Sequence, residues 1–242
     1  MTDEQAEHAP AFKRLSVLVP VFNERVTVGE ILRRMRRVEL PVDLEIIVVD
    51  DGSTDGTDKV LAALEDSTVM VLTHPENRGK GACIRTALAC AHGDLVLVQD
   101  ADLEYDPQDW PALLAPVLRG RARVVYGSRF LGERQTMPFT RHLGNRLLSL
   151  ATDVLYNTNL SDLETCYKLF DRSVLDAITI ESDGFDFEPE ITAKILRAGI
   201  PVYEVPISFA GREPTEGMKF TGADAARALG TLVRYRFRRE RT

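Results

Sequence analysis

The sequence contains little cysteine, no long apolar run and no excess of positive charge. Its three cysteines, Cys83, Cys90 and Cys166, are a low and odd number for 242 residues. They predict neither a disulfide framework nor a zinc site, and they fit a reducing compartment. No run of about 18 apolar residues is present, and the first ten residues are polar and acidic. We therefore expect no membrane-spanning helix, no signal peptide and a cytoplasmic location.

The overall charge is negative but unevenly distributed. The formal net charge is −7 and the isoelectric point is about 5.2. Because nucleic-acid-binding proteins usually present a basic face, we expect no nucleic-acid partner. Hydrophobic residues make up 44% of the chain and charged residues 28%, which indicates a globular domain rather than a disordered chain. Six arginines nevertheless lie within residues 227–241.

Short apolar runs alternate with segments of helical period, which predicts an α/β fold with a mostly parallel sheet and helices on both faces. The expected strands are residues 15–21, 46–49, 69–72, 95–98 and 124–126, and the intervening helices are 27–38, 57–65, 81–91 and 108–118. Beyond them we expect a loop at 128–138, helices at 139–156, 187–198 and 223–238, and strands at 165–170 and 202–205.

The carboxyl ends of the expected strands carry polar and charged residues, and ligands of parallel sheets bind beyond these ends. Asp100 and Asp102 directly follow the fourth strand. Two carboxylates at one turn suit Mg²⁺ or Mn²⁺, whereas a solvated acidic turn is the alternative for an isolated pair. Because the other strand ends are polar as well, we favour the metal site.

Two more strand ends offer groups for a nucleotide. Asp51 could accept a hydrogen bond from a nucleobase, while residues 53–55 are suited to capping the next helix. The loop 77–81 precedes a helix, whose free N–H groups would form an anion pocket with Lys80. A turn with a solvent-facing lysine is the alternative.

The second half of the chain offers cations for a phosphate and carboxylates for acid–base chemistry. Arg129 and Arg141 suit phosphate because a guanidinium binds it through two parallel hydrogen bonds. Asp162 and Glu164 could position an acceptor or act as a base, or they could be ordinary loop acids. No metal-ligand spacing is visible among the histidines, and we expect structural or surface positions for His74, His92 and His142.

Taken in order, these segments resemble family 2 glycosyltransferases of the GT-A fold. The matching segments are residues 19–24 (VPVFNE), 50–57 (DDGSTDGT), 78–81 (RGKG), 100–102 (DAD) and 127–129 (GSR). Within that family the chain is most similar to the dolichol-phosphate and polyprenyl-phosphate hexosyltransferases, such as the dolichol-phosphate mannosyltransferases. The segments that carry this closer resemblance are 127–130 (GSRF), 141–145, 161–163 (SDL) and 205–207 (VPI).

The resemblance implies a role for each candidate residue. A nucleoside-diphosphate sugar would be bound by Pro20, Phe22, Glu24, Asp51, Lys80 and Asp100. Asp100 and Asp102 would hold Mg²⁺ or Mn²⁺ on the diphosphate, and an acceptor phosphate would be bound by Arg129, Arg141, Arg212 and Lys219. The implied catalytic group is Asp102, Arg129, Asp162 and Glu164. Such enzymes transfer the hexose from UDP-glucose-type or GDP-mannose-type donors with inversion.

The expected role of the two carboxylates at 162 and 164 depends on the kind of acceptor. A phosphate acceptor is already anionic and hardly needs a base, whereas a sugar hydroxyl of a glycan or lipid-linked sugar would need Asp162 or Glu164. The alternatives are therefore a hydroxyl-directed enzyme of cell-surface polysaccharide synthesis and a nucleotide-sugar-binding protein without turnover. Intact Asp100 and Asp102 argue against the latter.

We expect one domain with two extensions. Residues 1–12 form a flexible acidic N-terminus and residues 13–222 the GT-A domain, with a nucleotide-sugar half at 13–127 and an acceptor half at 128–222. Residues 223–242 form a basic amphipathic helix, which suits an anionic membrane surface. The alternative is a helix packed on the core with a solvated basic end. The membrane interpretation would place the protein peripherally on the inner face of the cell membrane.

Overall fold

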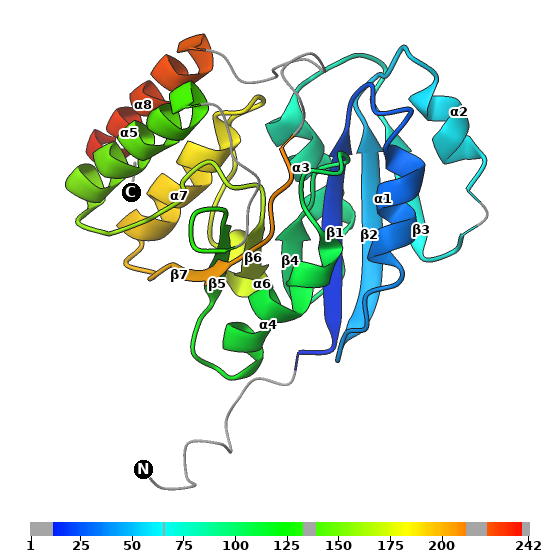
Figure 1. Ribbon diagram of the computed structural model, residues 1–242, viewed down its shortest axis with the longest axis horizontal. Helices are drawn as coiled ribbons and strands as arrows, with labels where there is room; N and C mark the ends of the chain where they lie inside the picture. The colour runs from blue at the N-terminus through cyan, green and yellow to red at the C-terminus, as the bar shows by residue number, and fades with distance from the viewer. Residues whose placement is uncertain (1–11, 65, 133–138, 212–221, 239–242) are drawn as a thin grey trace, which may run out of the picture.

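The computed structural model describes residues 12–64, 66–132, 139–211 and 222–238 (Figure 1). The sheet has seven strands in the order β3-β2-β1-β4-β6-β5-β7. Their bounds are β1 Arg14–Val21, β2 Asp43–Asp50, β3 Val69–Thr73, β4 Leu95–Val98, β5 Val124–Ser128, β6 Lys168–Asp171 and β7 Tyr203–Pro206. Among the described strands, only β6 runs antiparallel to its neighbours, β4 and β5, so the expected mostly parallel α/β sheet is confirmed.

Helices follow most strands and cover the sheet, with α1 in front of it and α3 behind it in Figure 1. The helices are α1 Val28–Met35, α2 Thr57–Ala62, α3 Lys80–Cys90, the 3₁₀ turn η2 Pro107–Asp109, α4 Trp110–Leu118, α5 Phe139–Tyr156, α6 Arg172–Asp176, α7 Phe187–Arg197 and α8 Gly222–Phe237. In α1, Val28, Ile31, Leu32 and Met35 are spaced at one face and all are buried. This spacing explains why the segment forms an amphipathic helix against the sheet.

The central strands are buried on both faces, as parallel strands between two helical layers must be. β1, β2 and β4 contribute consecutive β-branched and leucine side chains to the main core, including Val17, Ile47 and Leu97, which are fully buried. A second, smaller core joins α5, α7 and α8 through Leu148, Ala193, Ala228, Leu232 and Tyr235. The C-terminal helix therefore packs on the protein along one side.

Two features around β6 differ from the sequence-based expectation for local reasons. The strand expected at 165–170 begins at Lys168, because the Cys166 N–H donates to the Tyr105 hydroxyl at 3.1 Å and not to a neighbouring strand. The short helix α6 was not expected. It begins where the Asp171 side chain accepts a hydrogen bond from the Ser173 N–H, a capping arrangement that the sequence does signal.

Within the part of the chain that the structure describes, no helix combines the length and apolar character needed to cross a bilayer. The N-terminal residues 1–11, for which we expected flexibility, lie outside the described residues.

Candidate active site

A pocket of about 150 Å³ lies at the carboxyl ends of β1, β2 and β4, at the upper edge of the sheet in Figure 1. It is lined by Pro20, Val21, Phe22, Glu24, Asp51, Asn77, Gly79, Lys80, Cys83, Asp100, Ala101, Asp102 and Phe185. Every residue expected to bind the nucleotide sugar is in this lining. Strand ends far apart in sequence thus converge as the parallel topology requires.

Asp100 and Asp102 follow β4 on the wall of this pocket. One oxygen of Asp100 lies 2.8 Å from the Lys80 Nζ, and the Asp102 carboxylate accepts a hydrogen bond from the Glu104 N–H at 3.1 Å. The backbone therefore leaves the strand in a turn that presents both side chains to the same cavity. Carboxylate oxygens facing one cavity fit Mg²⁺ or Mn²⁺, which share their coordination with phosphate oxygens.

Lys80 joins the two halves of the chain at the pocket. Its Nζ lies 2.7 Å from Glu188 at the start of α7, as well as 2.8 Å from Asp100. Burial alone would lower the pKa of Lys80, but the neighbouring carboxylates of Asp100 and Glu188 raise it well above its ordinary value. The lysine is therefore a fixed positive charge at the inner end of the pocket rather than the solvent-facing group of the alternative interpretation.

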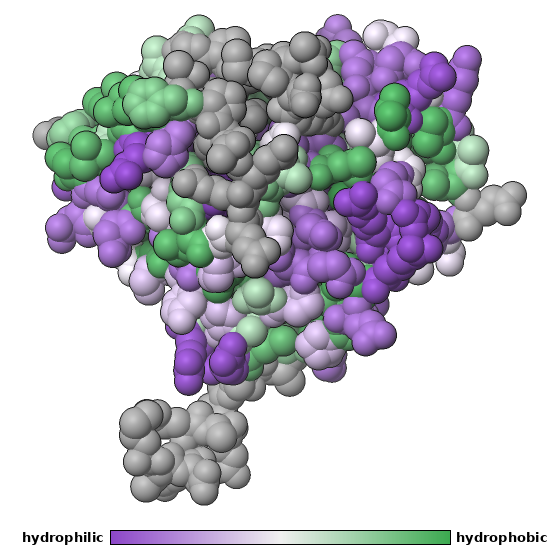
Figure 2. Space-filling model, viewed as in Figure 1, coloured by the Kyte–Doolittle hydropathy of each residue, from purple (hydrophilic) through white to green (hydrophobic). Residues whose placement is uncertain are grey.

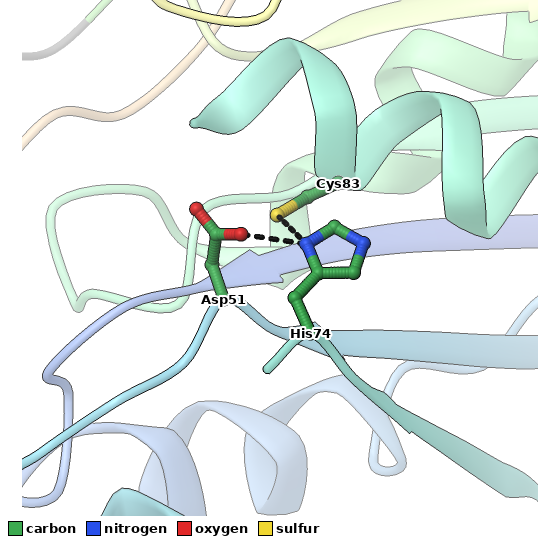
Figure 3. A group of neighbouring side chains, drawn as sticks. All are labelled: Asp51, His74 and Cys83. Atoms are coloured by element: carbon green, nitrogen blue, oxygen red, sulfur yellow. Dashed lines mark hydrogen bonds and ion pairs between the residues drawn. The ribbon is translucent and has the colours of Figure 1, made fainter. Parts of the chain in front are cut away.

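Asp51 accepts hydrogen bonds from two backbone N–H groups and contacts His74, a contact that Figure 3 shows. It accepts hydrogen bonds from the N–H of Arg78 at 3.0 and 3.1 Å and of Gly79 at 2.7 Å, and it lies 2.6 Å from Nδ1 of His74. The expected open anion pocket at the start of α3 is thus partly wrong. Two of the N–H groups expected to bind a ligand anion already donate hydrogen bonds to the Asp51 carboxylate.

The start of α3 also contacts the loop that precedes α7. The Ala82 N–H donates to the carbonyl of Asp183 at 3.1 Å, and the Arg85 guanidinium donates to the carbonyl of Ser182 at 2.5 Å. A Cβ atom at Gly79 or Gly81 would overlap those same loop carbonyls. Both glycines are therefore required by the close approach of two backbones, and this contact brings Phe185 to the pocket wall.

The rim of the pocket at the end of β1 is formed by Pro20, Phe22 and Glu24. The Phe22 side chain is partly exposed at the pocket, while Glu24 is buried. Glu24 accepts a hydrogen bond from the Thr27 hydroxyl at 2.7 Å, and its own N–H donates to the Thr57 hydroxyl at 3.0 Å. The rim thus combines an aromatic surface with a fixed carboxylate.

Arg129 and Asp162 form one buried unit beyond β5. The guanidinium donates two hydrogen bonds of 2.7 Å to the two Asp162 oxygens, and the Arg129 N–H adds a third at 3.0 Å. The Asp162 side chain is fully buried and that of Arg129 is 11% exposed. Since Asp162 is engaged on both oxygens, the geometry suits it to orienting the guanidinium.

Glu164 lies beside this unit in a different environment. Burial, together with the nearby charge of Glu188, raises the pKa of Glu164 to about 8. One oxygen of Glu164 and one of Glu188 are buried without a hydrogen-bond partner among the described residues. Such groups mark places where a ligand or water completes the hydrogen bonding.

Three residues expected to bind the acceptor cannot be placed by their side chains. Arg141 belongs to α5, but its side chain is outside the described part of the structure. Arg212 and Lys219 fall in 212–221, which the described residues do not include.

Two groups of side chains carry the donor atoms for a metal ion. Asp100 and Asp102 offer hard oxygen ligands in the pocket, whereas Asp51, His74 and Cys83 place one oxygen, one nitrogen and one sulfur within 4.8 Å of one another. Burial and the Asp51 charge raise the pKa of the Cys83 thiol, which favours its neutral form over the thiolate that binds metals. The pair at 100 and 102 is the better match to an ion that binds phosphate.

Sequence reasoning missed His74 and Glu188. His74 directly follows β3, and this strand-end position is a usable sequence signal for its approach to Asp51. Glu188 reaches Lys80 only because the loop at 182–184 packs on α3, and no local pattern announces that contact.

Comparison with known proteins places the chain among enzymes that transfer sugars. Residues 16–179 match the family described as Glycosyl transferase family 2. The undecaprenyl-phosphate mannosyltransferase of Micrococcus luteus is 31% identical over 233 residues, which cover 92% of this chain and 93% of that protein. The low-salt glycan biosynthesis hexosyltransferase of Haloferax volcanii is also 31% identical, but the match covers 82% of this chain and only 48% of that longer protein.

The fold is shared with a solved glycosyltransferase. Glucosyl-3-phosphoglycerate synthase from Mycobacterium tuberculosis, crystallised with Mn²⁺, UDP-glucose and phosphoglyceric acid, is 23% identical with a TM-score of 0.73. The similarity covers 98% of this chain and 84% of that one. The GT-A fold expected from the sequence is thereby confirmed.

Proposed function

The chain belongs to family 2 of the glycosyltransferases, and on that premise we propose that it transfers a hexose from a nucleoside-diphosphate sugar to a polyprenyl phosphate at a membrane surface. The observation that carries the proposal is the pocket at the strand ends, in which Lys80 lies beside Asp100 and Asp102 lines the same cavity. A second cation, Arg129, is fixed by Asp162 beyond β5 in the second half of the chain. The match to an undecaprenyl-phosphate mannosyltransferase over nearly its whole length supports the lipid-phosphate acceptor.

The donor would occupy the pocket with its base toward Asp51 and its diphosphate toward Asp100 and Asp102. Phe22 and Pro20 would cover the nucleoside, and Glu24 would accept from a ribose hydroxyl. Mg²⁺ or Mn²⁺ bound by the two carboxylates would offset the negative charge that develops on the departing nucleoside diphosphate. Lys80 adds a positive charge beside Asp100 at the same end of the pocket.

The acceptor phosphate would be bound on the side of Arg129. Asp162 holds the guanidinium in one orientation, so the arginine needs no rearrangement to meet an anion. A phosphate oxygen is already a nucleophile and would attack the anomeric carbon directly, with inversion. Arg141, Arg212 and Lys219 remain proposed further contacts to this phosphate.

An apolar face formed by α5 and α8 gives the proposal a route to the membrane. The residues Phe139, Leu143, Leu147, Leu150 and Val154 recur every three or four positions of α5, and each is exposed. On α8 the exposed residues Leu229, Val233 and Phe237 have the same spacing. Figure 2 shows hydrophobic side chains gathered over this pair of helices. Exposed apolar area of this extent is typical of a membrane or protein contact.

The charge of this face favours an anionic bilayer as its partner. Within α8, the three arginines Arg227, Arg234 and Arg236 stand against the single acid Asp224. This helix is basic in a protein whose net charge is −7. One side of α8 packs on the core, as in the alternative interpretation from the sequence, and the arginines and apolar residues exposed on its other side support the proposed membrane contact.

A hydroxyl acceptor is the second candidate, and Glu164 is the observation that favours it. With a pKa raised to about 8, this carboxyl could accept a proton from a sugar hydroxyl in mildly alkaline solution. Substitution distinguishes the two acceptors. Glu164→Gln should keep most transfer to a phosphate and should lose most transfer to a hydroxyl.

Transfer of label tests the proposed function. The protein would be incubated with labelled UDP-glucose, UDP-N-acetylglucosamine, UDP-galactose or GDP-mannose, with Mg²⁺ or Mn²⁺ and a short-chain polyprenyl phosphate. We expect label to enter the organic phase with one donor. Asp102→Ala should abolish the transfer, and Asp58→Ala, at an exposed site on α2, should not. Label that stays in water with every donor would contradict the lipid acceptor.

A further inference from the structure

The Asp51 carboxylate, whose contact with His74 is drawn in Figure 3, has little hydrogen-bonding capacity left for a ligand. One oxygen contacts His74 Nδ1 and the Arg78 N–H, and the other contacts the N–H groups of Arg78 and Gly79. An ionised carboxylate offers about four acceptor positions, and these contacts occupy most of them. Asp51 nevertheless lines the pocket, so it retains room for one further donor and not for two donors side by side.

His74 is fixed at both ring nitrogens, which makes it a rigid part of this arrangement. Nδ1 lies 2.6 Å from Asp51 and Nε2 lies 2.9 Å from the hydroxyl of Thr86 on α3. We assign the proton to Nδ1, because the carboxylate can only accept. In the neutral form of the ring, Nε2 then accepts a hydrogen bond from the Thr86 hydroxyl. The imidazole is buried, and rotation of the Asp51 carboxylate would break one of these contacts.

Guanine and uracil, the bases of GDP-sugars and UDP-sugars, differ in the hydrogen-bond donors that they present to such a carboxylate. Guanine presents a ring N–H next to an exocyclic amino group, two adjacent donors that match both oxygens of a free carboxylate. Uracil presents one ring N–H between two carbonyl groups. The side-chain amide of Asn77, which also lines the pocket, offers a donor for one of those carbonyls.

We propose that the pocket takes a uridine diphosphate rather than a guanosine diphosphate, and that His74 is the positioning residue that sets this preference. The inference rests on the proposed function, since it concerns the base of that donor. A guanine base at Asp51 would keep one of its two adjacent donors unpaired in a buried site, which lowers affinity strongly. Without the hydrogen bond from His74, the Asp51 oxygen that it contacts regains one acceptor position, and the discrimination falls.

The same three side chains could instead form a metal site, and the hydrogen-bond geometry argues against it. A separation of 2.6 Å between Nδ1 and the Asp51 oxygen is that of a hydrogen bond. Two ligands at about 2.0–2.2 Å from a tetrahedral Zn²⁺ lie farther apart than this. Cys83 lies 3.9 Å from the same nitrogen, as a thiol beside the pair.

Calorimetric titration of UDP and of GDP in the presence of Mn²⁺ tests the proposal. For the unmodified protein we expect UDP to bind at least about tenfold more tightly than GDP. His74→Leu should weaken UDP binding about tenfold or more and GDP binding much less, so that the preference largely disappears. His74→Asn, whose amide N–H can replace Nδ1, should retain most of the preference. His92→Leu, at an exposed histidine paired with Glu45, is the matched control and should change neither affinity.

Several results would overturn the inference. They are GDP binding as tight as UDP binding in the unmodified protein, equal weakening of both nucleotides by His74→Leu, or His74→Asn behaving like His74→Leu. Tight binding of Zn²⁺ alone that Cys83→Ser abolishes would replace the hydrogen-bonded cluster with a metal site. Failure of the unmodified protein to bind either nucleotide would instead contradict the proposed function. The UDP-to-GDP ratio of the unmodified protein stays decisive even if a variant fails to fold.

Discussion

Lys80 Nζ lies 2.7 Å from a carboxylate oxygen of Glu188, and this contact links the start of α3 to the start of α7 across the pocket. The Glu188 side chain is 5% exposed and that of Lys80 is 10% exposed. For an ion pair this well buried, the loss of stability on removing one partner comes mainly from leaving the other charge buried, and less from the lost attraction between the two.

Glu188→Gln should therefore destabilise the protein, although Asp100 still pairs with the lysine. We expect the free energy of unfolding to fall by about 3 kcal/mol, measured by urea denaturation. Asp176→Asn breaks the exposed pair with Arg172 and serves as the control, with a change below about 0.5 kcal/mol. Equal effects of the two substitutions would show that the buried contact has no special weight.

Removal of divalent metal should stop transfer reversibly. Asp100 and Asp102 are the carboxylates that we propose as ligands, and the charge on the departing diphosphate would otherwise be poorly compensated. A chelator should lower the initial rate at least about a hundredfold, and added Mn²⁺ or Mg²⁺ should restore it. Asp102→Asn should not respond to added metal at the same concentrations. Full activity in excess chelator would rule out the metal-dependent mechanism.

Gly81→Ala should loosen the contact between α3 and the loop before α7. The added Cβ would overlap the carbonyl oxygen of Ser182, and the backbone must shift to relieve the overlap. We expect a loss of about 1–3 kcal/mol in unfolding free energy and weaker nucleotide binding, measured by denaturation and calorimetry.

Gly144→Ala provides the opposite control for that substitution. Gly144 lies within α5, and apart from its chain neighbours and the backbone of α5 itself, no described atom lies within 4 Å of the position of its added Cβ. Because alanine favours a helix by roughly 1 kcal/mol over glycine, this variant should be as stable as the unmodified protein or more so. A destabilised Gly144→Ala variant would mean that the space around each glycine does not explain the different stabilities expected of the two variants.

Glu164 should make stability decline as the pH rises. Burial and the nearby Glu188 raise its pKa from the ordinary 4.5 to about 8 in the folded protein. Between these two values the folded state binds more protons than the unfolded state, so the unfolding free energy falls with increasing pH. Glu164→Gln should flatten this decline in denaturation curves from pH 5 to pH 8.5, whereas Glu39→Gln at an exposed position should not. An unchanged slope in Glu164→Gln would contradict the raised pKa.

The apolar face should determine binding to anionic vesicles. Leu147→Glu combined with Val154→Glu removes two exposed apolar side chains of α5 and adds like charge near the lipid. We expect at least about a tenfold loss of binding to phosphatidylglycerol vesicles in a sedimentation assay. Val26→Glu changes a residue that is 90% exposed outside this face and should have little effect. Unaltered sedimentation of the double variant would remove the membrane role of α5.

The sequence predicted which residues share the pocket better than it predicted the contacts among their side chains. Asp51, Lys80, Asp100 and Asp102 could be placed together because the ends of parallel strands share one edge, and the structure brings all four to one pocket. Strand and helix positions were also recovered closely, since β-branched runs and helical period are local signals. Their proposed chemical roles remain predictions.

The sequence could not predict contacts between segments that lie far apart along the chain. The ion pair of Arg129 with Asp162 depends on β6 returning between β4 and β5, and no spacing predicts that return. Likewise, α5 was identified as a helix, but its line of exposed apolar residues became visible only when α7 and α8 were seen to cover its other side.

The place of β6 in the sheet limits how this protein can be divided. β5 pairs only with β6 and β7 among the described strands, and β4 borders β6, so strands from late in the chain complete those from early in it. A fragment ended after Ser128 would leave β5 without a partner and β4 with a bare edge. Such edges pair readily with other chains. Exchange of donor specificity between related enzymes would therefore have to proceed by replacing pocket side chains within an intact sheet, not by joining the front of one chain to the back of another.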